Sequence, residues 1–372
     1  MSPPGTEWDY MVQAMNAKPS AVSRFKGCLI GGAVGDALGA PVEFMSLSEI
    51  RRKFGPEGIT SYSPAYGRIG AITDDTQMAL WSAEGLLRYH CRGQHRGVSH
   101  MPSMVHRAYL RWLVTQGESS RDRSYEAAQD PNYPGWLIGV KDLHARRAPG
   151  NTCLAALKSV GMGTMEKPKN DSKGCGGVMR VAPAGLYEQH PSRAFKMGRE
   201  IAALTHGHPT GYLASGCLAA IIAALTQGKN LRDAIDESMT LLAEDPASQE
   251  IADCVSRALA LYDKKADPVP ETVERIGQGW IAEEALAISI YCSLAHQDDF
   301  RKAVLLAVNH SGDSDSTGAI TGNILGTLLG VEAVPPDWIE PLELGAEIAT
   351  LAEDLHTRFR DDEEWFAKYP GG

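Results

Sequence analysis

The sequence lacks a paired-cysteine motif, an excess of basic charge and a long apolar run. Its seven cysteines are an odd number with no CxxC pair, which argues against a structural zinc site and favours reduced thiols in a reducing compartment. A net charge of −10 disfavours nucleic acid as a partner. The apolar runs are broken before ~18 residues and the N-terminus has no signal pattern, so we expect a cytoplasmic protein without a membrane span.

The chain also lacks the alternation of apolar and polar residues that is typical of half-buried strands, and it has no βαβ pattern. With 372 residues, of which 43% are hydrophobic, it can bury a large core. We therefore predict an all-α fold of about a dozen helices in one domain, residues 25–372. Residues 1–24 show no sustained helical period and are predicted to form an extension outside the core.

Two stretches, Phe25–Phe44 and His310–Gly330, share a glycine pattern. Glycine recurs at every fourth position in both: Gly27, Gly31, Gly35 and Gly39 in the first, and Gly318, Gly322, Gly326 and Gly330 in the second. This spacing places each set on one face of a helix, where every Gly costs roughly 0.5–1 kcal/mol relative to Ala. The most direct compensation is close approach of another backbone. We predict that the two helices pack together and bring their polar residues into one site.

Acidic residues open the second of these stretches. Asp313, Asp315 and Thr317 alternate with serines, as in an EF-hand loop, but position twelve of that loop would be Ile324 instead of a bidentate Glu. A turn that only caps a buried helix remains the alternative. Two carboxylates at a helix N-terminus are not fully neutralised by free N–H groups, whereas hard cations would neutralise them.

A second acidic cluster, Thr73-Asp74-Asp75-Thr76, precedes an amphipathic helix. Two acids between two threonines provide more oxygen ligands than one helix cap needs. A terpenoid-synthase DDxxD motif is excluded because Met78 stands at the third acid position.

Two further acids lie in or near the first glycine-rich helix. Asp36 falls within its apolar, glycine-lined sequence, and we interpret it as a hydrogen-bonded structural residue. Glu43 follows the helix stop at Pro41, in a loop of the kind that holds site residues.

The stretch Ser172–Leu186 carries Gly174, Gly176 and Gly177, which would let backbone N–H groups approach an anion, with Arg180 just beyond. A flexible turn is the alternative, and a Walker loop is excluded because no GK[ST] follows. After the next expected helix comes His206-Gly207-His208-Pro209. One of these histidines is expected either to contact a base or ribose, or to cap the helix.

The remaining segments give simpler expectations. The histidines and cysteine of residues 88–106 have the wrong spacing for a metal site, and we expect a solvated loop there. Residues 210–262 predict three helices, and Gly277–Ala295 predicts one more. The acidic pair Asp298-Asp299 is expected to be a plain N-cap.

Taken together, the GxxxGDALG helix with its following Glu, the TDDT turn, the GxGxxMR loop with the HGHP turn and the SGDSDSTGA helix resemble the ADP-ribosylglycohydrolase family. That family includes the dinitrogenase reductase-activating glycohydrolases. The resemblance spans roughly Phe25 to Val331, and residues 92–150, which would shape the acceptor side, match poorly. It implies an all-α fold that binds two Mg²⁺, with Mn²⁺ as the alternative ion.

The resemblance also implies residue roles. The implied metal ligands are Thr73, Asp74, Asp75, Asp313, Asp315 and Ser316. Glu43, Asp75 and Asp315 would be the catalytic acids, with Glu43 near the reactive bond. The loop residues Gly174, Gly176, Gly177, Val178 and Met179 would contact the pyrophosphate and ribose, and His206 would lie beside the adenosine end.

The expected function is Mg²⁺-dependent removal of ADP-ribose from a modified protein side chain, with arginine as the acceptor. One alternative is an immunity-type protein that sequesters an ADP-ribosyltransferase toxin through residues 1–24, with or without hydrolysis. Another is hydrolysis of a small ADP-ribose conjugate. The six oxygen ligands favour an enzyme, because a pure binder has no need of them. We expect the chain to act as a monomer.

Overall fold

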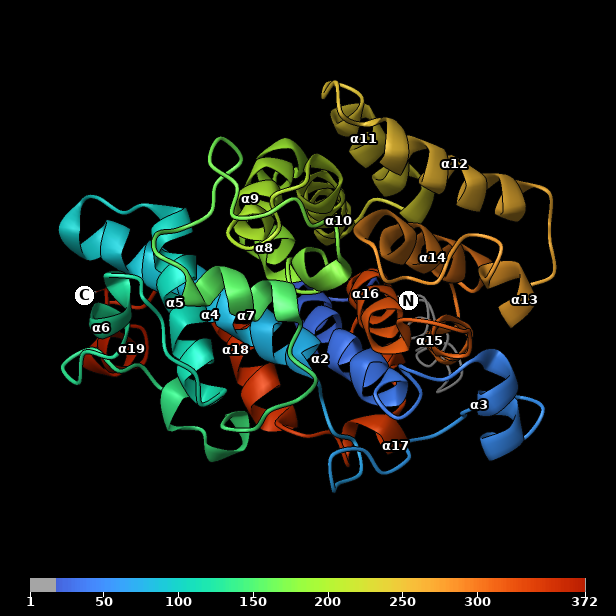
Figure 1. The fold of residues 1–372 in the computed structure, drawn as a ribbon, viewed down its shortest axis with the longest axis horizontal. Helices are drawn as coiled ribbons and strands as arrows, with labels where there is room; N and C mark the ends of the chain where they lie inside the picture. Colours follow the sequence, from blue (N-terminus) through green and yellow to red (C-terminus); the bar gives the residue numbers. More distant parts are fainter. Residues whose placement is uncertain (1–17, 372) are drawn as a thin grey trace, which may run out of the picture.

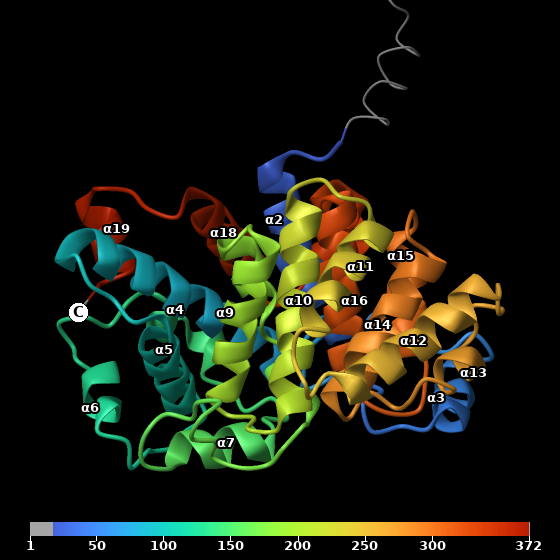
Figure 2. The same ribbon diagram turned by 90° about the horizontal axis from the view of Figure 1, so that it is seen from above.

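Two helices far apart in the sequence, α2 (Ala21–Gly39) and α16 (Ser314–Leu329), form the centre of the fold. Figure 1 shows them side by side, and Figure 2 shows the same pair from above, behind α10 (Pro209–Thr226). This structure is a computed structural model that describes residues 18–371. Regular structure in that range is helical, beside isolated β-bridges, and the all-α prediction is confirmed.

The glycine faces of α2 and α16 meet, as the sequence predicted. A Cβ atom added to Gly35 would lie 2.0 Å from the carbonyl oxygen of Gly318, and one added to Gly322 would lie 2.0 Å from that of Gly31. The Asn323 side chain crosses the interface and donates a hydrogen bond of 2.7 Å to the Cys28 carbonyl. Backbone therefore packs on backbone, which only glycine allows at this separation.

The other helices surround this pair. On one side α4 packs against α5, α18 packs against α2 and α4, and α19 lies farther out (Figure 1). On the other side α14 contacts α16, α15 and α12. The long α-helices of these groups are α4 (Asp74–Arg96), α5 (Met101–Thr115), α9 (Pro191–Ala203), α11 (Leu231–Leu242), α12 (Gln249–Asp263), α14 (Ala282–Ala295), α15 (Phe300–Val308) and α18 (Gly345–Thr357). The short ones are α3 (Leu47–Phe54), α6 (Ser124–Ala128), α7 (Asn151–Lys158), α8 (Ala182–Tyr187), α13 (Pro270–Val273), α17 (Pro336–Ile339) and α19 (Glu363–Lys368). Four 3-10 turns complete the set: η1 (Leu137–Gly139), η2 (Lys141–Leu143), η3 (Cys175–Gly177) and η4 (Val331–Ala333).

Helix α10 is the one described helix that is long and apolar enough to cross a membrane. Its environment gives another reason for the apolar sequence, since 83% of the 18-residue window is buried inside the protein. It packs against α8, α9 and α11 and also reaches α14 and α16. The three helices predicted for residues 210–262 correspond to α10, α11 and α12.

Three local expectations were wrong. Helix α2 begins at Ala21, with Ser20 as its N-cap, so residues 21–24 are helical. Helix α4 continues to Arg96, because Arg88 and Cys91 are buried and Gly93 is tolerated, and α5 begins at Met101. Most of the expected loop 88–106 is therefore helical, with only residues 97–100 between the two helices. Residues 277–281 precede α14 instead of belonging to it. Most of the expected N-terminal extension, residues 1–17, lies outside the described residues.

Candidate metal centre and the adjoining glycine loop

The turn that carries Asp74 and Asp75 is held in place by Asp36 of α2. Both carboxylate oxygens of Asp36 accept the Thr73 N–H at 3.0 Å, and one also accepts the Thr76 N–H at 3.1 Å. Thr73 caps α4, and its hydroxyl oxygen accepts the Asp75 N–H. Asp36 is fully buried. Its predicted structural role is confirmed: it fixes the start of α4 against α2.

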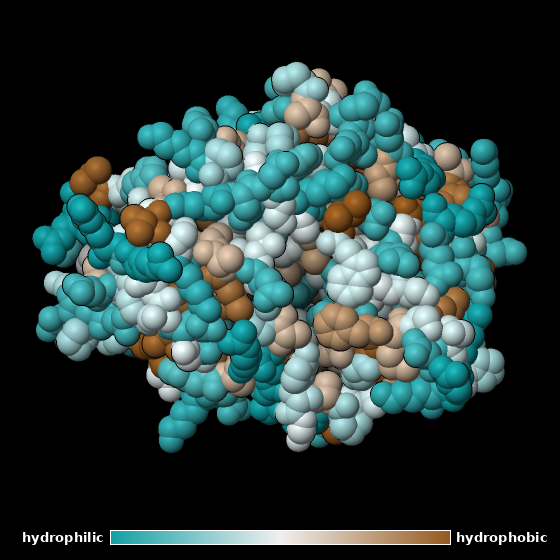
Figure 3. Space-filling model, in the orientation of Figure 1, coloured by the Kyte–Doolittle hydropathy of each residue, from teal (hydrophilic) through white to brown (hydrophobic). Residues whose placement is uncertain are grey.

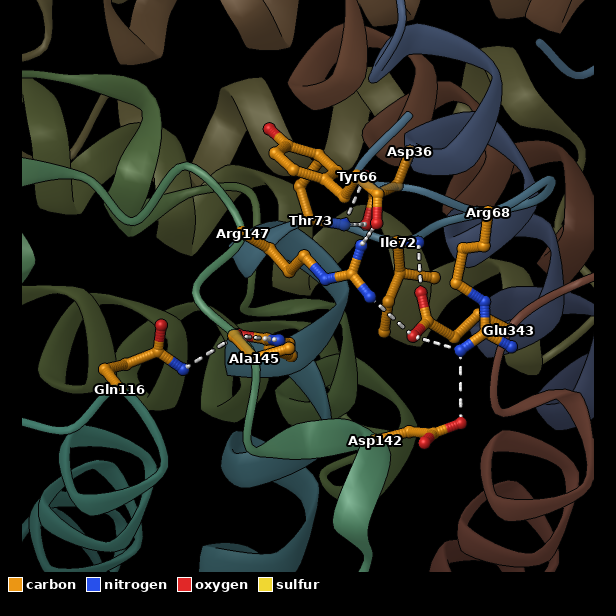
Figure 4. Close-up of polar contacts among 11 residues, drawn as sticks. Asp36, Tyr66, Arg68, Ile72, Thr73, Gln116, Asp142, Ala145, Arg147 and Glu343 are labelled. Carbon is orange, nitrogen blue, oxygen red and sulfur yellow. Dashed lines mark hydrogen bonds and ion pairs between the residues drawn. The ribbon is translucent and has the colours of Figure 1, made fainter. Parts of the chain in front are cut away.

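Two residues that sequence reasoning missed support the same turn from the other side (Figure 4). Buried Glu343 accepts the Ile72 N–H at 3.1 Å and pairs with Arg147 at 3.0 Å and with Arg68 at 2.7 Å. The Arg147 carbonyl in turn accepts the Asp74 N–H at 3.0 Å. No local pattern marks these residues, because 196 positions separate Arg147 from Glu343.

The second acidic turn begins α16. Asp313 is its N-cap and accepts the Ser316 N–H, and Asp315 accepts the same N–H at 3.0 Å. The backbone N–H of Asp313 donates to the Gln278 carbonyl at 2.8 Å. Gly312 makes this approach possible, since its φ is +136° and an added Cβ would lie 2.0 Å from that same carbonyl oxygen.

The acids of the two turns converge with Glu43. Glu43, Asp313 and Asp315 each place a carboxylate oxygen within 4.8 Å of the other two, and all three are buried. Asp74 and Asp75 are also buried, and Asp74 accepts the Gly150 N–H at 3.1 Å. Glu43 therefore groups with the Asp313 turn, which the sequence did not predict. The charge of Asp315 also acts on Asp74 and Asp75, and one site that holds both acidic motifs stays a prediction.

Burial and mutual repulsion favour protonation of these acids. Burial, followed by the charges of Asp315, Asp313 and other acids, raises the pKa of Glu43 to about 10. Burial and the charges of Asp315 and Asp74 hold the pKa of Asp75 well above its usual range. For Asp36, burial and then the charge of Asp315 raise the pKa to about 7, against hydrogen bonds that lower it.

The donor set fits a hard divalent cation. Glu43 Oε2 and Asp75 Oδ1 are buried and accept no hydrogen bond from the described residues. Within residues 18–371, no ion pair joins Glu43 or the four Asp residues of the two turns to Lys or Arg. Carboxylate and hydroxyl oxygens are the ligands that Mg²⁺ and Mn²⁺ prefer, and a cation would remove the repulsion that raises these pKa values.

The glycine-rich loop lies against the Asp313 turn. Gly174 forms a β-bridge with Ile281, and the Cys175 N–H, at the start of η3, donates to the Trp280 carbonyl at 3.2 Å. The segment 278–282 thus binds both the loop and, through Gln278, Asp313. Val178 and Met179 follow with buried side chains, and the N–H groups of both donate to the Cys175 carbonyl.

His206 supports this loop from beneath. An added Cβ at Gly176 would lie 3.0 Å from the His206 ring, and that ring shares a hydrogen bond of 2.9 Å with the Thr205 hydroxyl. Burial, and then the charge of Arg180, lowers the pKa of His206 to about 3, so the ring is neutral at physiological pH. His206 is 2% exposed, which places it in the packing between the loop and the end of α9.

Arg180, which follows the loop in sequence, does not face it. Its guanidinium is fully buried, donates to the Thr205 hydroxyl at 2.6 Å and lies 4.4 Å from the centre of the Tyr109 ring. A signal was present, since Arg180 stands inside the apolar run Val178–Ala182. An isolated cation in such a run is typical of a buried position with polar and aromatic partners.

Exposed aromatic residues lie next to the acids. Phe44 follows Glu43 and stacks on Trp280, with ring centroids 5.8 Å apart and planes at 18°. Tyr66 is also exposed, and burial of its hydroxyl end together with the charges of Glu43 and Asp315 raises its pKa. Figure 3 shows that the face seen in Figure 1 is hollowed near its centre, with residues of intermediate to high hydropathy around the hollow.

We expect the metal-free protein to lose stability as the pH rises from about 4.5. Because the folded pKa values are about 7 for Asp36 and about 10 for Glu43, the folded state keeps protons that the unfolded chain has released. The resulting stabilisation is complete below the unfolded values and is lost as pH rises through the folded ones. Calorimetric melting from pH 5 to 9 measures the trend, and Mg²⁺ should raise Tm more at pH 8 than at pH 5.5.

The control for this prediction is Glu43→Gln, which removes the titrating group with little change in size. Its melting temperature should depend less on pH than that of the wild type. A metal-free Tm that rises over the whole range in the wild type, or an unchanged slope in Glu43→Gln, contradicts the interpretation.

Comparison with known proteins agrees with this geometry. A family model described as ADP-ribosylglycohydrolase matches residues 17–364. The "ADP-ribosyl-[dinitrogen reductase] glycohydrolase" of Rhodospirillum rubrum is 26% identical, with 88% of this chain and 93% of the relative covered. The "ADP-ribosylarginine hydrolase Tri1" of Pseudomonas putida is 24% identical, over 91% of this chain and 79% of the relative. The "ADP-ribosylhydrolase ARH3" of Bos taurus is 26% identical, over 91% of this chain and 94% of the relative.

A solved structure gives the same result. The chain matches one titled "ADP-ribosylglycohydrolase-related protein complex" with a TM-score of 0.61 and 25% identity. The match covers 91% of this chain and 98% of the other.

Proposed function

The chain belongs to the ADP-ribosylglycohydrolase family, and on that premise we propose that it is a Mg²⁺-dependent hydrolase that removes ADP-ribose from arginine side chains of modified proteins. Family membership supports ADP-ribosyl hydrolase activity. The single observation that carries the finer proposal is the acidic centre beside the glycine loop. Buried carboxylates of Glu43 and the Asp313 turn group there, and the charges of Asp313 and Asp315 act on Asp75 of the other turn.

The metal ligands in this proposal are Thr73, Asp74, Asp75, Asp313, Asp315 and Ser316. Each is buried at the start of α4 or α16. The Asp36 and Glu343 hydrogen bonds fix the turn before α4, and the Gln278 carbonyl holds the Asp313 turn before α16. When bound, a pair of Mg²⁺ ions supplies Lewis-acid polarisation of the ribose hydroxyls. Mn²⁺ satisfies the same oxygen donors and is the expected substitute.

The acids have a second task at the scissile bond. Hydrolysis of an N-glycosidic bond passes through an oxocarbenium-like state, in which positive charge develops at the anomeric carbon. Glu43, Asp75 and Asp315 are fixed around the centre and place negative charge there before the reaction begins. Glu43 lies in the loop after α2, so it is the acid we assign to the space next to the departing side chain.

Other residues are assigned to the nucleotide. We assign the Gly174–Met179 loop to the pyrophosphate and ribose, as in other glycine-rich anion loops. The N–H groups of Gly174, Cys175, Val178 and Met179 already donate within the protein, so the assignment depends on those of Gly176 and Gly177. His206 holds that loop from beneath, and a contact of its ring edge with the adenosine end remains a prediction. Its neutral state suits a hydrogen bond better than an ion pair.

Arginine is the proposed acceptor because its guanidinium is positively charged, like the ligands an acidic site attracts, and can also stack on the exposed aromatic rings next to that site. An arginine side chain leaving an acid-lined pocket meets exposed Phe44, Tyr66 and Trp280, and guanidinium groups stack on aromatic rings. The relatives' printed names support the same class, since one names ADP-ribosylarginine and another names a modified protein. A third names no acceptor, so the acceptor is the part of the proposal that most needs a test.

The test uses proteins modified with ADP-ribose on arginine, with and without Mg²⁺. We expect free ADP-ribose and an unmodified arginine to appear only when Mg²⁺ or Mn²⁺ is present, measured by chromatography and mass spectrometry. A protein modified through serine or glutamate serves as the control. If Mg²⁺ or Mn²⁺ does not cause release of ADP-ribose from arginine, the acceptor assignment is wrong. If no conjugate releases ADP-ribose, the hydrolase proposal is wrong.

Two alternatives receive less support. The immunity-type binding protein depends on residues 1–24, and no contact of the described part of that segment favours it. Hydrolysis of a small ADP-ribose conjugate would use the same centre, and the same experiment addresses it when a low-molecular-weight conjugate replaces the protein.

A further inference from the structure

We propose that Cys175 gives the acidic centre a second metal-binding mode, in which its sulfur and the Asp313 carboxylate together bind a thiophilic divalent ion such as Zn²⁺ or Cd²⁺. The inference rests on the proposed role of the centre as a cation site. Cys175 Sγ lies 2.7 Å from Asp313 Oδ2. All seven cysteines belong to the described residues, and Cys175 is the one that is not fully buried.

The sulfur and the carboxylate are held together by backbone contacts. The Cys175 N–H binds the Trp280 carbonyl, and the Asp313 N–H binds the Gln278 carbonyl. Both residues are therefore tied to one short segment. Gly279 within it has a φ of +86°, and an added Cβ there would lie 3.3 Å from Asp313 Cβ, so this segment packs directly on the turn. Their proximity is a property of the fold and does not depend on free side-chain rotation.

A second, independent observation points to a cation at the same place. Glu43 Oε2 and Asp75 Oδ1 belong to side chains that are more than nine-tenths buried, and neither oxygen accepts a hydrogen bond. Glu43 shares the cluster with Asp313, the carboxylate that contacts Cys175. Burial and the charges of Asp313 and Asp75 raise the pKa of the Cys175 thiol, so a metal ion has to displace its proton. An acceptor without a donor therefore belongs to the same cluster as the carboxylate of the pair.

The chemistry of this pair differs from that of an all-oxygen site. Sulfur prefers Zn²⁺ and Cd²⁺, whereas Mg²⁺ binds oxygen alone. Zinc lies about 2.3 Å from sulfur and about 2.1 Å from oxygen, so two ligands of one tetrahedral ion are about 3.5 Å apart. The pair has to open by less than about 1 Å. As the metal–sulfur bond forms, the S–H bond breaks and its proton leaves to solvent.

This mode sets two ions in competition. Asp313 belongs to the proposed magnesium ligands, so a thiophilic ion bound to Cys175 and Asp313 withdraws that carboxylate from Mg²⁺. We expect micromolar Zn²⁺ to inhibit the Mg²⁺-loaded protein, and a chelator with higher affinity for Zn²⁺ to restore it.

The test is a Cd²⁺ titration of the metal-free full chain, followed by the ultraviolet charge-transfer absorption of cadmium thiolate. The wild type should show one saturable band. Cys175→Ser should lose the band and roughly tenfold or more in Cd²⁺ affinity, while calorimetry shows that it still binds Mg²⁺. Cys217→Ser is the matched control, since it removes a fully buried thiol of α10 and should keep the band.

The outcomes separate this inference from the proposed function. If the wild type binds Mg²⁺ but gives no band, or if Cys175→Ser keeps the band, the Cys175 ligand is wrong and the hydrolase proposal stands. If the wild type gives the band but binds no Mg²⁺, the magnesium-dependent function fails instead. If Cys175→Ser does not fold, the Cd²⁺ titration is repeated on Asp313→Asn, which keeps Cys175. An unchanged Cd²⁺ affinity of Asp313→Asn also overturns the inference.

Discussion

Gly322→Ala is expected to destabilise the protein by more than about 4 kcal/mol or to prevent folding, although alanine is the better helix former. The added Cβ would lie 2.0 Å from the Gly31 carbonyl oxygen and 2.5 Å from its carbon. Because these are backbone atoms of α2, they cannot move aside as a flexible side chain would. The two helices must separate, and the void between them costs burial along their whole length.

The matched control is Gly93→Ala, in the interior of α4. An added Cβ there meets nothing closer than the Ser99 Cβ at 4.0 Å. The same substitution should therefore stabilise the protein by roughly 0.5–1 kcal/mol. Urea unfolding followed by circular dichroism measures both. If Gly322→Ala unfolds at the wild-type midpoint, the close contact of α2 and α16 is wrong.

Asp315→Ala is expected to reduce turnover by about a thousandfold or more, and Asp74→Ala to have the same effect. Asp315 is a charged donor at the point where the cluster and both turns meet, and its charge raises the pKa of Asp36, Glu43 and Asp75. The metal-free Asp315→Ala protein should be as stable as the wild type or more so, because one source of repulsion is gone. Kinetics at saturating Mg²⁺ and melting in EDTA measure the two effects.

Asp299→Ala provides the control for Asp315→Ala. Asp299 is also an aspartate at a helix N-terminus, where it accepts the Lys302 N–H, but it lies outside the acidic cluster. Its loss should cost about 1 kcal/mol of stability and leave turnover unchanged. Near-normal activity of Asp315→Ala at saturating Mg²⁺ would show that this carboxylate is not a metal ligand.

Features with a local signature could be predicted from the sequence. The four-residue glycine spacing specified which faces of α2 and α16 meet, since only close backbone contact compensates for so much glycine. The excess of oxygen donors at Asp313 and Asp315 predicted an acidic cluster, and these two acids do lie in one. Asp299 is the N-cap that its position before α15 predicted. In each case the residues that cause the feature are close together in the sequence, so the feature could be predicted from a local pattern.

Features that depend on distant partners could not be predicted. Glu343 is an ordinary acid in the sequence, and its function comes from Arg147 and the Ile72 N–H, both supplied by remote segments. Residues 277–281 have a composition compatible with helix, but their backbone groups bind the glycine loop and the Asp313 turn instead. The position of Arg180 likewise depends on remote partners, because its guanidinium binds the Thr205 hydroxyl and lies over the Tyr109 ring.

The meeting of α2 with α16 also constrains how the protein is made. The Asn323–Cys28 hydrogen bond joins residues 295 positions apart, so α2 leaves the ribosome long before its partner exists. At about 5–20 residues per second, that delay is roughly 15–60 s. Throughout it, the apolar faces of α2 have no native surface to cover them. The nascent chain is therefore expected to need a chaperone, and stalling translation before residue 314 should leave α2 sensitive to protease.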